Sequence, residues 1–274
     1  MKRNLVASLP FCYTAYTRIQ TISGGLGYLL QEILPLVVAS CAFKLYLLPR
    51  LAILYFLWIT VYEAGYLWND HRDRQLKDER NRLSGATISF WIFGASHICF
   101  AFVLLGVLGL MCGWSQMAYA GLINLALLAL LILHSSAHLR KYPYARLTTF
   151  SALVFYKYAP MLLPLLGYRL GSLALICIFF FCGLARVCVY ALRKYGRPLE
   201  SPEHVVQAKL QTGLLIFAIP LLIAEAAAPR NRGFPLALSL WVTYAIGTAI
   251  LWMGRQLKTI IRSPRSIPAL AKMP

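Results

Sequence analysis

A short polar stretch at residues 66–85, YLWNDHRDRQLKDERNRLSG, holds four of the nine acidic residues of the chain within ten positions. It follows directly behind a long hydrophobic run. If the helix formed by that run continues past its end, Asn69, Asp70 and Asp73 lie three or four residues apart and can converge on one site. Oxygen ligands on one helical face suit Mg²⁺, which typically takes one or two carboxylates and completes its octahedron with water and substrate phosphates. We therefore expect magnesium as a cofactor, Asn69, Asp70 and Asp73 as its ligands, and Asp70 and Asp73 as catalytic residues.

Basic residues stand beside these carboxylates, since residues 69–82 also contain five Arg or Lys residues. A metal that bridges to a diphosphate leaves further negative charge, which Arg and Lys side chains neutralise. The residues expected to bind the diphosphate come from this stretch and from the ends of two later hydrophobic runs: Arg72, Lys77, Arg82, Arg140, Lys141, Arg193 and Lys194. The alternative is a solvated loop whose acids balance its bases, with the later basic residues serving only as topology anchors.

Ionisable residues also occur within or near the hydrophobic runs: Glu32, Glu63, Lys157, Arg186, Lys209 and Glu225. Such residues are costly in lipid unless they are paired or face a polar cavity. Glu63 lies seven residues before Asp70 and therefore on nearly the same helical face. Lys157, beside Tyr156, either reaches into a cavity or pairs with an intramembrane Glu. We expect Glu63, Tyr156 and Lys157 to line a cavity.

The apolar runs that must position these residues dominate the composition. Of 274 residues, 59% are hydrophobic and 13% are charged, against roughly 25% charged in soluble domains. Several runs reach the roughly 20 residues that a helix needs to cross a bilayer, and helices satisfy their own backbone groups there. This predicts an all-α, polytopic membrane bundle of about eight helices. The expected spans lie near 23–43, 50–68, 88–112, 116–134, 147–167, 170–192, 207–227 and 233–254.

The formal charge of +18 first suggests nucleic acid, but the distribution of the basic residues argues against such a partner. Eight spans place both termini on one side of the membrane, and that side carries nineteen Lys or Arg residues against five on the other. By the positive-inside bias the nineteen lie in the cytoplasm. We therefore expect an integral, multi-pass membrane protein with cytoplasmic termini, in the inner membrane if the organism is bacterial, whose basic face attracts membrane lipids or phosphorylated substrates.

No polar stretch is long enough for a soluble domain, so the chain is expected to form one membrane domain. Residues 1–22 are expected to be a cytoplasmic or interfacial segment, residues 23–254 the transmembrane domain, and residues 255–274 a basic cytoplasmic tail. The longer, charged loops all fall on the cytoplasmic side, which favours an active surface on that face because functional groups concentrate on loops held by a rigid scaffold.

The polar stretch resembles the first signature of the UbiA-type intramembrane prenyltransferase superfamily, Asn-Asp-x-x-Asp-x-x-x-Asp at the cytoplasmic end of the second helix. This chain has Asn69, Asp70 and Asp73 there, followed by Arg82-Leu-Ser-Gly85, which is similar to the family's Arg-Pro-Leu-x-Ser-Gly. After the fourth expected span, residues 134–143 look like the family's Tyr-Ser…Lys-x-x-Pro stretch. With the order of helices, the resemblance covers residues 23–254.

The chain departs from the family pattern at three places. The position of the third carboxylate is Lys77, and Asp78 falls one residue late, about 140° around a helix from Asp73 instead of about 40°. The family's second signature, Asp-x-x-x-Asp after the sixth helix, is missing, since no acid precedes Glu200 there. Either Arg193 and its basic neighbours bind the diphosphate in place of a second metal ion, or the site is no longer catalytically active. The family's usual ninth span is not visible in this sequence.

The resemblance implies an enzyme that transfers an isoprenoid group from a polyprenyl diphosphate to an aromatic or other lipophilic acceptor, with magnesium-assisted departure of the diphosphate. Aromatic faces such as Tyr156 and Tyr158 are expected to stabilise the resulting allylic cation. Two alternatives stay open: an intramembrane terpene cyclase of the same fold, and a non-catalytic lipid-binding or transport protein derived from it.

Overall fold

The computed structural model describes residues 11–19, 21–41, 47–75, 90–136, 139, 141–195, 203–227 and 234–262. Within these residues every regular element is a helix and no strand occurs, which confirms the all-α prediction. Five helices are long and apolar enough to cross a membrane, namely Gly24–Cys41, Leu48–Asn69, Ile92–Cys112, Trp114–His134 and Ala159–Tyr195. Two shorter apolar helices follow at Val205–Pro220 and Pro235–Leu251. The chain therefore has the helical, membrane-embedded character that its composition predicts.

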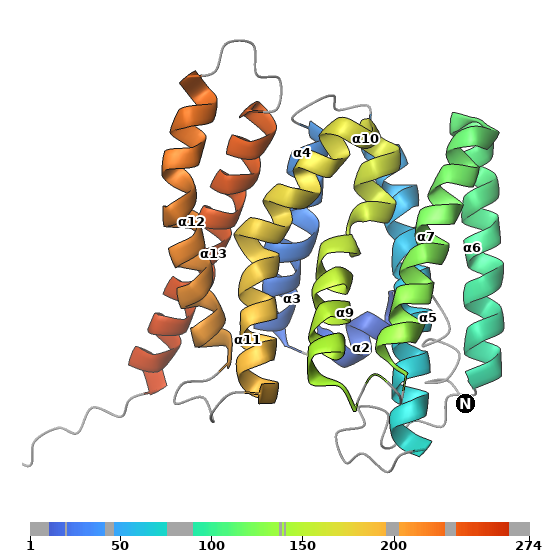
Figure 1. The fold of residues 1–274 in the computed structure, drawn as a ribbon, viewed down its shortest axis with the longest axis horizontal. Helices are drawn as coiled ribbons and strands as arrows, with labels where there is room; N and C mark the ends of the chain where they lie inside the picture. The colour runs from blue at the N-terminus through green and yellow to red at the C-terminus, as the bar shows by residue number, and fades with distance from the viewer. Residues whose placement is uncertain are drawn as a thin grey trace, which may run out of the picture.

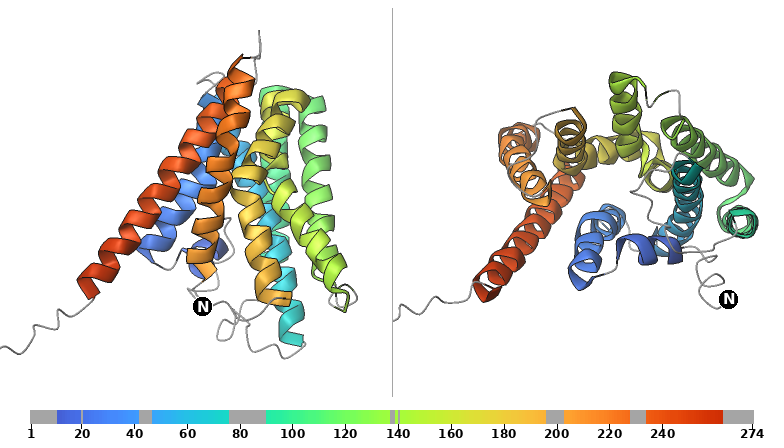
Figure 2. Two further views of the ribbon diagram at one scale, coloured as in Figure 1. Left: turned by 60° about the vertical axis from the view of Figure 1, so that its left-hand side comes forward. Right: turned by 90° about the horizontal axis from the view of Figure 1, so that it is seen from below.

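Figure 1 shows the helices in their order along the chain. The first part of the bundle comprises α2 (Cys12–Arg18), α3 (Ile22–Tyr28), η1 (Leu29–Ile33), α4 (Leu34–Cys41), α5 (Leu48–Gln75), α6 (Phe90–Cys112) and α7 (Trp114–His134). The second part comprises α9 (Pro143–Tyr156), α10 (Ala159–Ile178), η3 (Phe179–Gly183), α11 (Leu184–Tyr195), α12 (Glu203–Ala227) and α13 (Phe234–Arg262). The elements η1 and η3 are short π-helices inside otherwise α-helical rods. Figure 2 shows α6 at one edge of the bundle and α12 and α13 at the other, with α3, α5, α9 and α11 between them.

The outer helices expose large apolar side chains. On α6, Leu110 and Phe102 are 84% and 70% exposed, and on α7 Leu122 is 66% exposed. A helix that is apolar all round is stable only where both its sides meet apolar surroundings. These faces therefore fit contact with lipid.

The long apolar helix at 159–195 bends sharply at Gly167, where φ is 75° and ψ is 169°. This backbone conformation is open almost only to glycine. The arms of the bend approach closely, because a Cβ added at Gly171 would lie 2.8 Å from the carbonyl oxygen of Leu162. Figure 1 shows the chain turning over at α10. The bend falls at the last residue of the expected span 147–167, shortly before the next expected span, 170–192.

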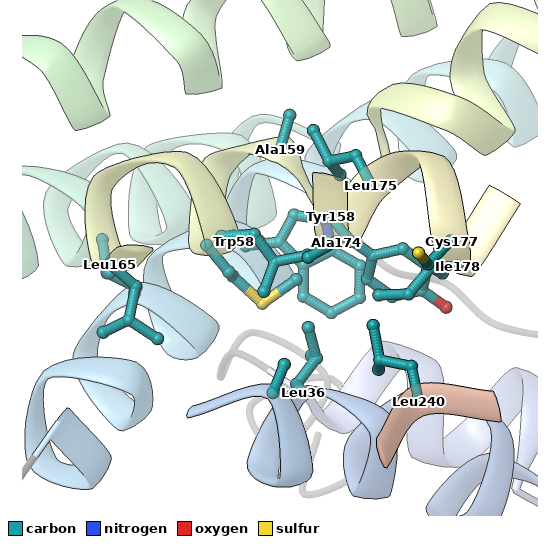
Figure 3. Packing of buried hydrophobic residues seen from close by; sticks show 14 of the residues in the cluster. Leu36, Trp58, Tyr158, Ala159, Leu165, Ala174, Leu175, Cys177, Ile178 and Leu240 are labelled. Atoms are coloured by element: carbon teal, nitrogen blue, oxygen red, sulfur yellow. The ribbon is translucent and has the colours of Figure 1, made fainter. Parts of the chain in front are cut away.

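The apolar core joins the inner helices of the bundle. Trp58 of α5 packs with Leu36 of α4, Leu240 of α13 and the buried face of α10 (Figure 3). The helices α5 and α7 approach closely at Gly65, where an added Cβ would lie 2.5 Å from Cδ1 of Leu131. Small residues at such crossings let helix backbones pack in lipid, where no hydrophobic force drives them together. This packing holds α5 at the centre of the molecule.

Candidate functional site

Three aromatic residues at four-residue intervals, Trp58, Tyr62 and Tyr66, form a ladder along one face of α5. The rings of Trp58 and Tyr62 are stacked with centroids 5.0 Å apart. The rings of Tyr62 and Tyr66 meet edge to face at 4.7 Å, and their hydroxyl oxygens are 3.0 Å apart. We call these three residues the aromatic ladder. It presents a continuous π surface inside the bundle.

The predicted metal ligands lie at the end of this helix. The helix α5 continues past Trp68 to Gln75, as the sequence interpretation requires. Seven-residue steps from Tyr62 to Asn69 and from Tyr66 to Asp73 each turn the helix by about 20°, so positions 69 and 73 are in helical register with the ladder. Asn69 is half-buried, whereas the side chains of Asp70 and Asp73 lie outside the described residues. Their convergence on a metal ion therefore stays a prediction.

The predicted diphosphate-binding cations gather at the same end of the bundle as far as the structure describes them. Three of them lie outside the described residues, namely Lys77, Arg82 and Arg140, and so does the side chain of Arg72. Lys141 is exposed just before α9, while Arg193 and Lys194 are exposed in the last turn of α11.

Two contacts organise that end of the bundle. The Tyr195 hydroxyl donates a hydrogen bond of 2.9 Å to the carbonyl of Pro143, which ties the end of α11 to the start of α9. Arg193 already has a surface partner, because its Nε lies 3.1 Å from Oε1 of Glu203. This pair is about half exposed on both sides, so it adds little stability and leaves Arg193 accessible.

A buried charge cluster lies deeper in the bundle, at the inner end of the ladder. One oxygen of Glu32 accepts hydrogen bonds from Lys157 Nζ at 2.6 Å and from the Tyr158 hydroxyl. The other accepts from Arg186 Nη1 at 2.7 Å. We call Glu32, Lys157, Tyr158 and Arg186 the charge cluster. Of the two alternatives for Lys157, the structure shows pairing with an intramembrane Glu.

Every member of the charge cluster sits at or near a break in regular α-helix. Glu32 lies in η1, Lys157 and Tyr158 form the turn between α9 and α10, and Arg186 follows η3 by three residues. Short π-helices are frequent at functional sites because they redirect side chains. Irregular backbone at membrane depth is tolerated only where protein covers it or where it lines a cavity. Three separate breaks in regular helix thus lie at or near the residues that surround the Glu32 carboxylate. Such a coincidence indicates that the fold is arranged to form this cluster.

The charge cluster also touches the aromatic ladder. Lys157 Nζ lies 5.8 Å and 5.5 Å from the ring centroids of Trp58 and Tyr62, which is cation–π range. Glu32 is the one carboxylate among the described residues that pairs with Lys157 and Arg186, so the formal charges of these three residues sum to +1. At 1.5 Å per residue, Asp73 lies about 16 Å along α5 from Tyr62. The ladder and the acids thus follow one another along α5, and the cations of the charge cluster lie against the inner end of the ladder.

Glu63 has partners within the protein, and the cavity role expected of it stays a prediction. Its side chain is fully buried and accepts hydrogen bonds from the backbone N–H groups of Phe11 at 3.0 Å and Thr14 at 2.6 Å. Nε2 of His97 lies 3.2 Å from the same carboxylate. Glu63 therefore satisfies the free N–H groups at the start of α2, a favourable place for negative charge. These bonds also hold Phe11 at a φ of 76°, which a residue with a side chain rarely adopts.

The remaining predicted cavity residue, Tyr156, is 46% exposed and packs edge to face on Phe155 with centroids 5.7 Å apart. Among the described residues, no group of three or more His, Cys, Asp or Glu residues is arranged to hold a metal ion. The predicted magnesium site falls largely outside those residues. Sequence reasoning did not pick out the aromatic ladder, although its four-residue spacing was a usable signal.

Comparisons with protein-family models, with curated proteins and with solved structures gave no match to this chain. Function is therefore inferred from the acidic end of α5, the aromatic ladder and the charge cluster.

Proposed function

We propose that this chain is an intramembrane prenyltransferase that transfers an isoprenoid group from a polyprenyl diphosphate to an aromatic or other lipophilic acceptor. The observation that carries the proposal is the aromatic ladder, which runs along α5 toward the end of the helix that contains Asn69, Asp70 and Asp73. A prenyl diphosphate has the same order of parts, an apolar chain and a charged head. The resemblance of residues 69–85 to the UbiA-type signature supports the same reading.

The head of the substrate would lie at the end of α5. The amide oxygen of Asn69 and the carboxylates of Asp70 and Asp73 are ligands that would suit magnesium. Magnesium bound there would neutralise the charge that develops on the departing diphosphate. Lys141, Arg193 and Lys194 at the same end of the bundle supply fixed positive charge for the rest of the head group. In this proposal they replace the metal that a second acidic motif would hold.

The aromatic ladder would receive the allylic end of the isoprenoid. Loss of diphosphate leaves a carbocation, and the negative faces of aromatic rings stabilise a cation within about 6 Å. Lys157 already lies over Trp58 and Tyr62, and a second positive charge there is repelled. The reacting carbon is therefore assigned to the Tyr66 end of the ladder, nearest the acids. The apolar chain then extends into the bundle.

The topology proposed for this activity has eight spans and two cytoplasmic termini. It is supported by five long apolar helices, two shorter ones and the bend at Gly167 that divides the longest of them. In Figure 1 the end of α5, the start of α9 and the end of α11 lie at one end of the bundle. The excess of basic residues expected on this side supports a cytoplasmic location for it, where a soluble diphosphate leaving group can depart.

A terpene cyclase would use the same head-group site and ladder, and product analysis with and without an acceptor separates the two enzymes. The charge cluster favours a second candidate, a carrier or lipid-binding protein. Ionisable residues at helix breaks inside the membrane are typical of transport pathways. In that case the chain would bind a lipophilic anion without releasing diphosphate.

Binding of a prenyl diphosphate to the full chain in lipid nanodiscs tests the proposed function. We expect saturable binding of geranylgeranyl diphosphate that weakens at least about tenfold when EDTA removes magnesium, because the metal carries much of the head-group interaction. Geranylgeraniol, which lacks the diphosphate, is the control and should compete poorly. Failure of short and long prenyl diphosphates to bind at all would overturn the proposal. Binding that EDTA does not weaken would favour the carrier or lipid-binding protein.

A further inference from the structure

The short helix α2 is held against the bundle by one buried carboxylate. Glu63 has no exposed surface, and its carboxylate accepts from the backbone N–H groups of Phe11 and Thr14 and lies against Nε2 of His97. Phe11 and Thr14 belong to the first turn of α2, whereas His97 belongs to α6. A buried charge is costly unless it is paired and hydrogen-bonded. The carboxylate therefore needs α2 in its docked position.

Backbone strain at the start of α2 opposes this docking. Phe11 is the N-cap residue and has a φ of 76°. A residue with a side chain keeps this left-handed conformation only where the surrounding structure holds it there. Among the described residues, α2 forms no broad packing interface with another helix. Segments with few packing contacts open at a lower free energy than the rest of a protein. Loss of the Glu63 hydrogen bonds should therefore release α2.

The position of α2 brings it to the end of the aromatic ladder. Seen from below in Figure 2, the dark-blue α2 lies crosswise between α3 and α5. Its Tyr13 forms a small buried cluster with Leu67 of α5 and Phe93 of α6, where the Tyr13 and Phe93 rings meet edge to face at 5.9 Å. Tyr66, the last residue of the ladder, packs against this cluster. Release of α2 would thus uncover the Tyr66 end of the ladder.

The first residue of α2 also reaches the helix on its other side. The ring of Phe11 meets that of Tyr28 on α3 edge to face, with centroids 6.0 Å apart. We propose that α2 is a lid over the Tyr66 end of the aromatic ladder and that the hydrogen bonds to Glu63 hold this lid closed. The identity of the ligand that enters beneath the lid rests on the proposed function, whereas the closure of the lid does not.

Hydrogen–deuterium exchange of the full chain in nanodiscs tests the closure without any ligand. In Glu63→Gln one carboxylate oxygen becomes an NH2 group, which can only donate and so faces other donors. We expect the backbone amides of residues 12–18 to exchange about tenfold faster or more, while those of α6 keep their rates. The control Glu203→Gln removes an exposed carboxylate and should change the exchange of α2 less than about twofold.

Hydroxyl-radical footprinting of the same proteins tests whether α2 covers the ladder. In Glu63→Gln the ring of Tyr66 should be oxidised about three- to tenfold faster, because the open lid admits solvent to it. Tyr168 on α10 is 75% exposed already, so its oxidation should stay the same.

A milder variant serves if Glu63→Gln does not fold. His97→Phe removes one donor to Glu63 and keeps an aromatic ring beside Phe93, on which the His97 ring now stacks at 3.9 Å. Both rates should rise in this variant as well. Unchanged exchange of α2 would overturn the role of Glu63, and faster exchange of α2 with unchanged oxidation of Tyr66 would show that α2 is not a lid. Neither readout uses a prenyl diphosphate, so a failure of that ligand to bind counts against the proposed function alone.

Discussion

Asp73→Asn is expected to lower magnesium-dependent release of diphosphate from a prenyl diphosphate by on the order of 100-fold or more. The substitution keeps the size of the side chain and removes the negative charge that a hard divalent cation prefers. The helix α5 continues through residue 73, and position 73 is in helical register with Tyr66 of the ladder, seven residues earlier. Release is measured as inorganic phosphate after addition of a pyrophosphatase.

The matched control for this substitution is Glu203→Gln. It also removes one carboxylate near the same end of the bundle, but this carboxylate belongs to the exposed pair with Arg193. Release should change less than about twofold, because exposed ion pairs contribute little. If diphosphate release is the same in Asp73→Asn as in the unaltered protein, Asp73 is not a catalytic residue.

Glu32→Gln is expected to destabilise the protein by about 3 to 5 kcal/mol, the cost of leaving buried charges without their partner. Glu32 lies close to the middle of the apolar helix Gly24–Cys41 and holds both Lys157 and Arg186. Removing its charge leaves two cations in surroundings that have few other acceptors. The free energy of unfolding is measured by titration with a denaturing detergent.

A second substitution separates charge from packing. Lys157→Met in the Glu32→Gln background removes one of the two stranded cations, so part of the lost stability should return. Gln is nearly isosteric with Glu, so a defect of packing alone would not be rescued by Lys157→Met. A loss below about 1 kcal/mol in Glu32→Gln would show that the charge cluster does not hold the spans together.

The sequence was sufficient for the features that depend on composition and on local helical periodicity. The apolar runs predict helices, and the structure confirms an all-α molecule with five helices long enough to cross a membrane. The expected convergence of Asn69, Asp70 and Asp73 requires the helix to continue past Trp68, and α5 does continue to Gln75. Both features follow from interactions within one helix, which a single sequence displays directly.

Features that depend on tertiary pairing could not be predicted in the same way. Glu32 and Arg186 stand out in the sequence as ionisable residues in apolar runs, but their partners are more than a hundred positions away along the chain. The π-helices that redirect them have no simple residue pattern. Glu63 illustrates the same limit: the sequence shows an ionisable residue in an apolar run, but not that its carboxylate caps α2, which comes from a segment about fifty residues earlier. The choice of partner is made only when the helices pack.

Photolabelling with a benzophenone-bearing prenyl diphosphate tests most directly whether the α5 face receives the isoprenoid. With magnesium present, the label is expected on the part of α5 that contains Tyr62 and Tyr66, and an excess of unlabelled geranylgeranyl diphosphate should remove it. Label confined to the lipid-facing residues of α6 and α7, or label on α5 that neither the competitor nor EDTA reduces, would contradict the account.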